Sequence, residues 1–133
     1  MIAWEGSSLV ITLFRNWETS VRDYFDAYRA MVEHRSLSQW VKIIDFTDYV
    51  DPADLVHLLY GEEFLQIRKD IANWSVKRGM VRQVIILHPA ISQDLTEQLL
   101  IVYDNEGAPA EAVTSRLAAH QRAREILSSR PDF

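Results

Sequence analysis

Two acidic residues and a histidine lie where apolar runs of the sequence end. Asp45 and Asp48 lie at and just after the end of the run Val41–Phe46, and His88 ends the run Val81–His88. In open α/β sheets, ligands bind beyond the carboxyl ends of the strands. We interpret the two runs as adjacent parallel strands, and in that arrangement Asp45 or Asp48 approaches His88. A carboxylate that orients an imidazole can begin an acid–base pair or a metal site.

Structural roles compete for the same side chains. Asp51 followed by Pro52 fits a helix N-cap with proline at the first helical position. Asp48 fits a turn. His88, directly before Pro89, fits a side chain that ends a strand by bonding to the backbone. These structural roles are the favoured interpretation, so an enzyme that uses Asp45 and His88 is the third of our functional hypotheses.

Sequence motifs for the common catalytic and cofactor sites are missing. There are no cysteines, and the four glycines form neither a G-x-G-x-x-G nor a Walker pattern. Nucleophile-elbow, His-x-x-x-His, His-Glu-x-x-His and EF-hand spacings are missing as well. The sequence therefore predicts no catalytic residue set, no metal site and no cofactor.

Charge and hydropathy limit the partners of the chain. The net charge is −5, from 19 acidic and 14 basic residues. Binding to a nucleic-acid backbone needs clustered Lys and Arg, and no basic stripe is present. The longest apolar runs, Val84–Leu87 and Leu99–Tyr103, fall far short of the ~20 residues that span a bilayer. Residues 1–8 lack the pattern of a signal peptide. We expect a cytoplasmic protein with no transmembrane segment and no nucleic-acid partner.

Aromatic residues are numerous, with four Trp and five Tyr. Most of them are expected to fill the core, because aromatic side chains dominate core burial. Trp17 and Tyr49 fall in predicted loops, where we expect them to stay partly exposed. Exposed Trp and Tyr are typical anchors of protein interfaces. Together with Asp45, Thr47, Asp48 and His88, they are the candidate residues for binding a ligand or partner.

Hydrophobic period and helix caps predict the elements that position these residues. Strands that alternate with helices imply right-handed crossovers. The predicted fold is α/β, with an N-terminal β-hairpin, alternating β/α units and a mostly parallel sheet of about four to five strands with helices packed on it. Ser20 with Asp23 matches a helix capping pattern. The predicted elements are strands at Ile2–Trp4 and Leu9–Phe14, a helix at Ser20–Arg35, a strand at Val41–Phe46, two helices between Pro52 and Gly79, a strand at Val81–His88, a helix from Ser92 to near Asn105, a strand at Ala112–Ala118 and a helix at His120–Ser128.

The C-terminal part admits a second interpretation. On periodicity alone, Glu111–Leu127 could equally form a single helix. In either case residues 1–128 are expected to form one domain, and residues 129–133 a tail.

Several of these features together match a known pattern. An N-terminal hairpin and helix precede Ile43-Ile44-Asp45-Phe46-Thr47 and an Asp-led helix, with a later strand at Val84–Leu87 and a closing helix that contains Ala123–Leu127. In this the chain resembles STAS domains, and it is most similar to the bacterial SpoIIAA-like proteins of this length. The resemblance runs from about Ile2 to Leu127 as a pattern. It implies a SpoIIAA-like fold and favours a strand at Ala112–Ala118.

One departure from the STAS pattern bears on function. Signalling STAS domains carry a phosphorylatable serine at the start of the helix after the Asp-ending strand. The matching stretch here, Asp51–Asp54, has no hydroxyl, and the nearest one is on Thr47. The phosphorylation switch of the anti-sigma-factor antagonists is therefore not expected.

Three functions remain as hypotheses. The first is a non-enzymatic regulatory module that binds a protein partner or forms a homodimer. The second is a small apolar-ligand or lipid-binding protein, because the resemblance groups the chain with lipid-binding α/β domains. A groove for that ligand is predicted between Leu58, Leu59, Phe64 and Ile67. The third is the Asp45–His88 enzyme.

Overall fold

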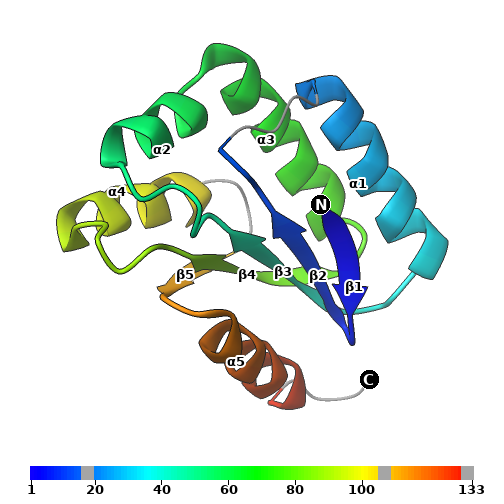
Figure 1. Cartoon of the computed structure of the whole chain (residues 1–133). Coiled ribbons are helices and arrows are strands. Elements are labelled where there is room, and N and C mark those ends of the chain that lie inside the picture. The colour runs from blue at the N-terminus through cyan, green and yellow to red at the C-terminus, as the bar shows by residue number, and fades with distance from the viewer. Residues whose placement is uncertain (16–19, 105–108, 130–133) are drawn as a thin grey trace.

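A computed structural model shows a five-stranded sheet with helices on both faces (Figure 1). It describes residues 1–15, 20–104 and 109–129. The strands are β1 (Ile2–Glu5), β2 (Ser8–Thr12), β3 (Trp40–Asp45), β4 (Met80–Ile86) and β5 (Ala110–Val113). The helices are α1 (Val21–Arg35), α2 (Pro52–Leu59), α3 (Glu62–Val76), α4 (Gln93–Asp104) and α5 (Arg116–Ser128).

The strands lie in the sheet in chain order, from β1 to β5. β1 is antiparallel to β2, and all other neighbours are parallel. The predicted α/β fold with a mostly parallel sheet is confirmed. So is the predicted pairing of β3 with β4, in which Ile43 faces Val84 and Asp45 faces Ile86. Helices α1 to α4 lie on one face of the sheet, and α5 lies alone on the other (Figure 1).

The larger part of the core lies between the sheet and α1 to α4. Trp40 on β3 and Tyr28 on α1 are both fully buried there, with ring centroids 6.4 Å apart. The indole N–H of Trp40 donates to the carbonyl of Arg78 at 2.8 Å. Aromatic pairs of this kind bury large apolar areas, and the polar edge of the Trp needs its partner once buried.

The smaller part of the core lies under α5. Ala119, Ala123 and Ile126 of α5 pack on alternate residues of β2, β3 and β4. The two alanines recur at a step of four, so they lie on one face of the helix and let it lie close to the sheet. With both faces of the sheet covered, β3 is buried along its whole length, as expected for a central parallel strand.

Two predicted helix caps are confirmed. The Ser20 hydroxyl accepts the N–H of Asp23 at 3.1 Å at the start of α1. The Asp51 carboxylate accepts the N–H of Ala53 at 2.9 Å at the start of α2, with Pro52 as the first helical residue. Each cap satisfies an amide that has no partner within the helix.

The prediction for the C-terminal part is wrong in its boundaries. A strand was expected at Ala112–Ala118, but β5 ends at Val113 and α5 begins at Arg116 rather than at His120. The single helix over Glu111–Leu127 is also wrong. Pairing with β4 holds residues 110–113 extended, and the Ser115 hydroxyl then accepts the N–H of Ala118 and starts the helix.

No helix within the described ranges is both long enough and apolar enough to cross a membrane.

Candidate functional site

The carboxylate of Asp45 lies at the end of β3, on the face covered by α5. The residue is only 5% exposed. Its Oδ1 accepts the backbone N–H of Thr47 at 2.9 Å and the Thr47 hydroxyl at 2.6 Å. Its Oδ2 accepts Nε–H of Arg116 at 2.9 Å. The structure thus brings together two predicted site residues, Asp45 and Thr47, with an arginine that the sequence reasoning did not include.

Arg116 comes from the first turn of α5, and its side chain is 44% exposed. It also donates to the hydroxyl of Thr12, which faces Asp45 on the neighbouring strand. Its Nη1 lies 3.9 Å from Glu5 Oε1, and the other carboxylate oxygen of Glu5 lies 2.9 Å from His120 Nε2. We call Thr12, Asp45, Thr47 and Arg116 the Asp45 cluster.

The sequence held only a weak signal for Thr12 and Arg116. Thr12 is a hydroxyl residue near the end of an apolar run, and Arg116 was placed inside a predicted strand. A correct helix start at Ser115 would have put Arg116 at the carboxyl edge of the sheet.

The pKa of Asp45 shows what this carboxylate can do. Burial raises the pKa, but the hydrogen bonds from Thr47 and Arg116 outweigh burial, so the pKa lies below its ordinary value. A general acid or base at neutral pH needs a pKa near 7. Asp45 is shifted the opposite way and stays ionised, which fits a structural anchor for Arg116.

His88 does not join the Asp45 cluster. Its Nδ1 accepts the N–H of Ala90 at 3.0 Å, which is the strand-ending role considered from the sequence. No ion pair links it to a carboxylate of the described residues. Two causes are visible. Both carboxylate oxygens of Asp45 already have partners, and the chain leaves β3 and β4 toward the same face of the sheet (Figure 1). In open α/β sheets, a ligand-binding crevice forms where the connections after two neighbouring strands go to opposite faces of the sheet.

Asp48 and Tyr49 join two loops. Asp48 Oδ2 accepts the backbone N–H of Arg15 at 2.6 Å, and Arg15 Nε lies 3.4 Å from Asp54 Oδ2. The Tyr49 hydroxyl donates to the carbonyl of Phe14 at 3.2 Å. These contacts hold the segment after β2 against the segment after β3.

The predicted exposure of Tyr49 is wrong. The residue is 4% exposed, because its hydroxyl reaches the Phe14 carbonyl and its ring packs edge-on against Phe46. Two neighbouring residues are exposed instead: Phe14, whose carbonyl Tyr49 binds, to 45%, and Val50, which follows Tyr49, to 47%. We call residues 14–15 and 48–50 the loop pair. The predicted site residue Trp17 lies outside the described residues.

A small cavity lies between α3 and the sheet. Phe64 and Ile67, two of the four residues predicted to line an apolar groove, border it. Leu59 is buried in the core, and Leu58 instead borders a hollow beside the loop pair. The space inside the cavity is that of about one water molecule. An apolar ligand would have to displace the surrounding side chains.

Two cations that are almost fully buried border the same cavity. Lys42 is 3% and Arg68 is 4% exposed. The Lys42 ammonium lies 5.0 Å from the centre of the Tyr28 ring, and the Arg68 guanidinium lies 5.0 Å from that of Tyr103. Arg68 also donates to the Leu59 carbonyl at 3.2 Å. Cation–π contacts gain strength when they are removed from water.

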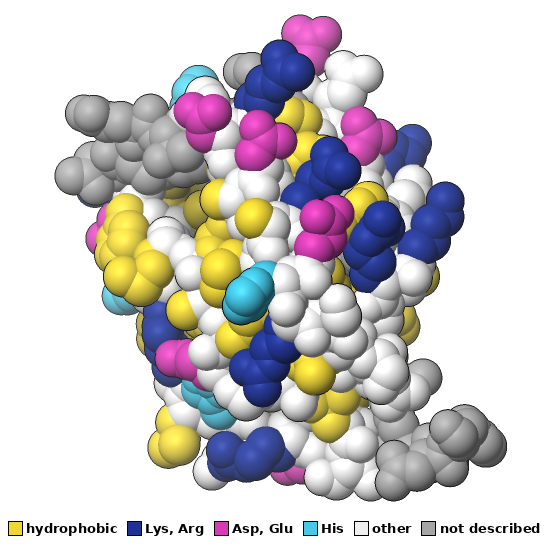
Figure 2. Space-filling model, turned by 90° about the vertical axis from the view of Figure 1, so that its right-hand side faces the viewer, with side chains coloured by type: hydrophobic (Ala, Val, Ile, Leu, Met, Phe, Trp, Pro, Cys, Tyr) yellow, Lys and Arg dark blue, Asp and Glu magenta, His cyan; other side chains and the backbone are white. Residues whose placement is uncertain are grey.

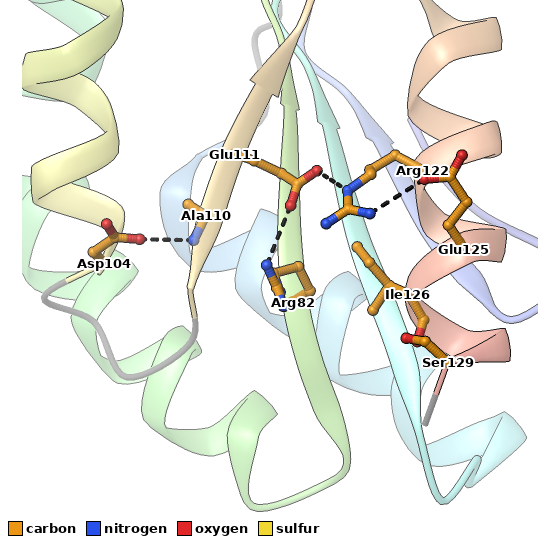
Figure 3. A network of polar contacts seen from close by, with 8 residues as sticks. All are labelled: Arg82, Asp104, Ala110, Glu111, Arg122, Glu125, Ile126 and Ser129. Carbon is orange, nitrogen blue, oxygen red and sulfur yellow. Dashed lines mark hydrogen bonds and ion pairs between the residues drawn. The ribbon is translucent and has the colours of Figure 1, made fainter. Parts of the chain in front are cut away.

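A second polar network ties α5 to the far edge of the sheet (Figure 3). Glu111 on β5 accepts from Arg82 Nη1 at 3.2 Å and from Arg122 Nε, and Arg122 also reaches Glu125 at 3.2 Å. The two carboxylates raise the pKa of Arg122. This network holds α5 against the edge of the sheet.

Neither metal-binding side chains nor a similar known protein indicates what reaction or ligand the described residues would serve. No group of three or more His, Asp or Glu side chains in the described part of the chain could hold a metal ion. Comparison with protein-family models, with curated proteins and with solved structures gave no match. Functional inference therefore starts from the Asp45 cluster and the loop pair.

Proposed function

We propose that the chain is a non-enzymatic, protein-binding regulatory module of STAS-like type, and that the loop pair is its docking surface. The observation that carries this proposal is the exposure of Phe14 and Val50 on two loops that are fixed to each other. Hydrogen bonds of Asp48 to Arg15 and of Tyr49 to Phe14 join the loops. The exposed apolar side chains are therefore held on a rigid base.

Rigid exposed apolar residues suit a binding surface. A partner that docks on them avoids much of the entropy loss that comes with ordering a mobile loop. Charged residues adjoin them: Arg15 follows Phe14 and pairs with Asp54, and Asp48 precedes Val50 by two positions and binds the Arg15 amide. An apolar centre with a polar rim is the usual composition of a protein interface.

The STAS-like assignment is supported by the order of the elements. β3 ends in Asp45, and the next helix begins with Asp51 and Pro52, as the resemblance implied. The Asp51 carboxylate already occupies the amino end of α2 by accepting the N–H of Ala53. A carboxylate at this end interacts favourably with the helix dipole. Partner binding is therefore independent of phosphorylation at this helix start.

The site geometry favours binding over catalysis. Asp45 is ionised and held by Arg116, and His88 bonds to the backbone of Ala90. Each side chain of the hypothetical acid–base pair thus has a structural partner of its own.

The test is a quantitative pull-down from native lysate with three baits. They are the wild type, the double variant Phe14→Glu/Val50→Glu, and the control Ile101→Glu. Ile101 lies on α4 and is 62% exposed, so the control also replaces an exposed apolar residue by Glu. We expect a partner that the wild type and Ile101→Glu both retain and that the double variant loses. A partner set that the double variant retains in full would refute the loop pair as the docking surface.

A further inference from the structure

β1 is an outer strand of the sheet, and half of its backbone groups face outward. Met1 exchanges hydrogen bonds with Thr12 on β2, at 2.8 and 3.0 Å. Backbone groups of successive residues in a strand point to opposite sides. The N–H and C=O groups of Ala3 and Glu5 therefore face β2, and those of Ile2 and Trp4 face away from the sheet. No described residue bonds to these outward groups.

At the opposite edge of the sheet, one outward amide has a side-chain partner. At β5, the N–H of Ala110 is bound by the Asp104 carboxylate at 2.7 Å (Figure 3). Proteins commonly protect sheet edges with side chains, lysines or prolines, because an open edge pairs with another strand. The sequence of β1, Ile-Ala-Trp-Glu, contains neither lysine nor proline.

An apolar groove runs beside this open edge. It lies between β1 and α1 and is bordered by Met1, Ile2, Ala27, Ala30 and Met31, among others. Figure 2 shows this side of the molecule, where acidic and basic side chains are mixed and hydrophobic ones lie between them. An apolar strip next to unpaired backbone groups is the surface that an added strand and its helix would cover.

α1 and β1 run in the same direction. The indole N–H of Trp4 donates to the carbonyl of Met31 at 2.9 Å, and the Arg35 guanidinium lies 5.5 Å from the Trp4 ring centre. The end of the helix therefore lies over the end of the strand. The middle of β1, at Ala3, then lies level with the middle of α1, near Ala27 and Ala30.

We propose that a second copy of the chain pairs with this edge, β1 against β1, about a two-fold axis at Ala3. In that antiparallel register, Ile2 faces the partner's Trp4, and the two residues exchange both hydrogen bonds. By symmetry, Trp4 and the partner's Ile2 exchange two more hydrogen bonds. All four outward N–H and C=O groups of each strand are then satisfied. Ala3 lies opposite the partner's Ala3 in a non-hydrogen-bonded pair. In such a pair the two Cα atoms are closely spaced, so a small side chain fits.

The same axis makes α1 complementary to its copy. Asp23, Ala27, Ala30 and His34 are exposed and recur at steps of three and four, so they form one stripe along the helix. Two such stripes in antiparallel orientation place Ala27 opposite the partner's Ala30. The acidic first turn, with Asp23, then faces the basic last turn, with His34 and Arg35. This self-complementary charge pattern identifies a second copy, rather than a foreign strand, as the occupant. The interface is separate from the loop pair and does not depend on the function proposed for it.

The first experiment is sedimentation equilibrium of the whole chain, at about 10 to 500 µM because dimerisation depends on concentration. We expect the wild type to reach twice the chain mass of 15.4 kDa. The double variant Ala27→Glu/Ala30→Glu places like charges on both sides of the axis and should stay monomeric. The control Gln66→Glu/Gln98→Glu changes two exposed positions on α3 and α4 and should dimerise.

A second variant tests the strand itself. Ile2→Pro removes an outward N–H and no bond to β2, so it should abolish the dimer, whereas Ile2→Val should keep it. Hydrogen exchange gives an independent measure. The amides of Ile2 and Trp4 should exchange about tenfold more slowly at high than at low protein concentration. The amide of Ala3, which faces β2, should not respond.

Three outcomes would overturn the proposal. One is a wild type that remains monomeric over the whole concentration range. Another is a dimer that persists in both Ala27→Glu/Ala30→Glu and Ile2→Pro. The third is a dimer in which the Ile2 and Trp4 amides exchange at their monomer rates.

Discussion

Replacement of Asp45 by Asn tests the most buried ionic contact of the candidate site. Asparagine keeps the oxygen that accepts from Thr47, but its amide group turns N–H donors toward Arg116 Nε. A hydrogen bond to a charged group contributes about 1.5 to 3 kcal/mol. Arg116 is 44% exposed, so water replaces part of the lost interaction. We expect the free energy of unfolding to fall by about 2 kcal/mol, near the low end of that range.

The assay is urea unfolding followed by Trp fluorescence, first at pH 7. Arg116→Gln and the double variant Asp45→Asn/Arg116→Gln complete a mutant cycle. Residues in direct contact should show a coupling of about 1 kcal/mol, so the double variant loses less than the sum of the single losses. Additive losses would refute the interpretation that Asp45 acts by holding Arg116.

The pH dependence gives a second test of the same contact. The pKa of Asp45 is lower in the folded protein than its ordinary value of 3.8. The folded state thus favours the ionised form, and the resulting stability is fully present well above that value. It is lost as pH falls through the folded pKa. The stability difference between wild type and Asp45→Asn should therefore be constant near neutral pH and shrink below about pH 4. A difference that grows on acidification would contradict the sign of the shift.

Three further predictions concern the rest of the fold. Gly79 has φ 100°, and an added Cβ would strike a backbone carbonyl, so Gly79→Ala should destabilise by about 3 kcal/mol in urea unfolding. The control Gly6→Ala, with φ 64° and open space around it, should cost only about 1 kcal/mol. The Tyr28 hydroxyl lies 2.6 Å from Ser75, whose own proton goes to a helix carbonyl. Tyr28→Phe should therefore lower the unfolding free energy by about 1 kcal/mol, and the exposed Tyr60→Phe should leave it unchanged. Native mass spectrometry should show no retained apolar ligand, because the cavity under α3 has room for about one water; a stoichiometric lipid adduct would revive that hypothesis.

The local elements were predictable because their causes lie within a few residues. The caps at Ser20 and Asp51 each bind an amide two or three positions along the chain. The alternation of buried strands with amphipathic helices also predicted a mostly parallel sheet with β3 beside β4. The C-terminal boundary was not predictable on the same basis. Residues 110–113 are extended because they pair with β4. The hydrophobic period of Glu111–Leu127 also fits a helix.

The candidate site depended on contacts between distant parts of the chain. Arg116 reaches Asp45 across 71 residues of sequence, and Tyr49 reaches Phe14 across 35. Contacts between residues so far apart in the sequence leave no periodic pattern in it. From the sequence, Asp45 therefore pairs with His88, a strand-end imidazole, and Tyr49 is expected to be exposed.

The amino-acid sequence alone determined the fold class, the helix starts and the residues at the strand ends, because backbone hydrogen bonding and hydrophobic period act over short distances. The tertiary structure alone decided which of those side chains meet. Packing α5 onto the second face of the sheet brought Arg116 to Asp45, and the contacts of the loop pair buried Tyr49 and left Phe14 and Val50 exposed. The tertiary structure also placed β1 at an edge of the sheet. Whether a strand has an unpaired side depends on the order of all the strands in the sheet.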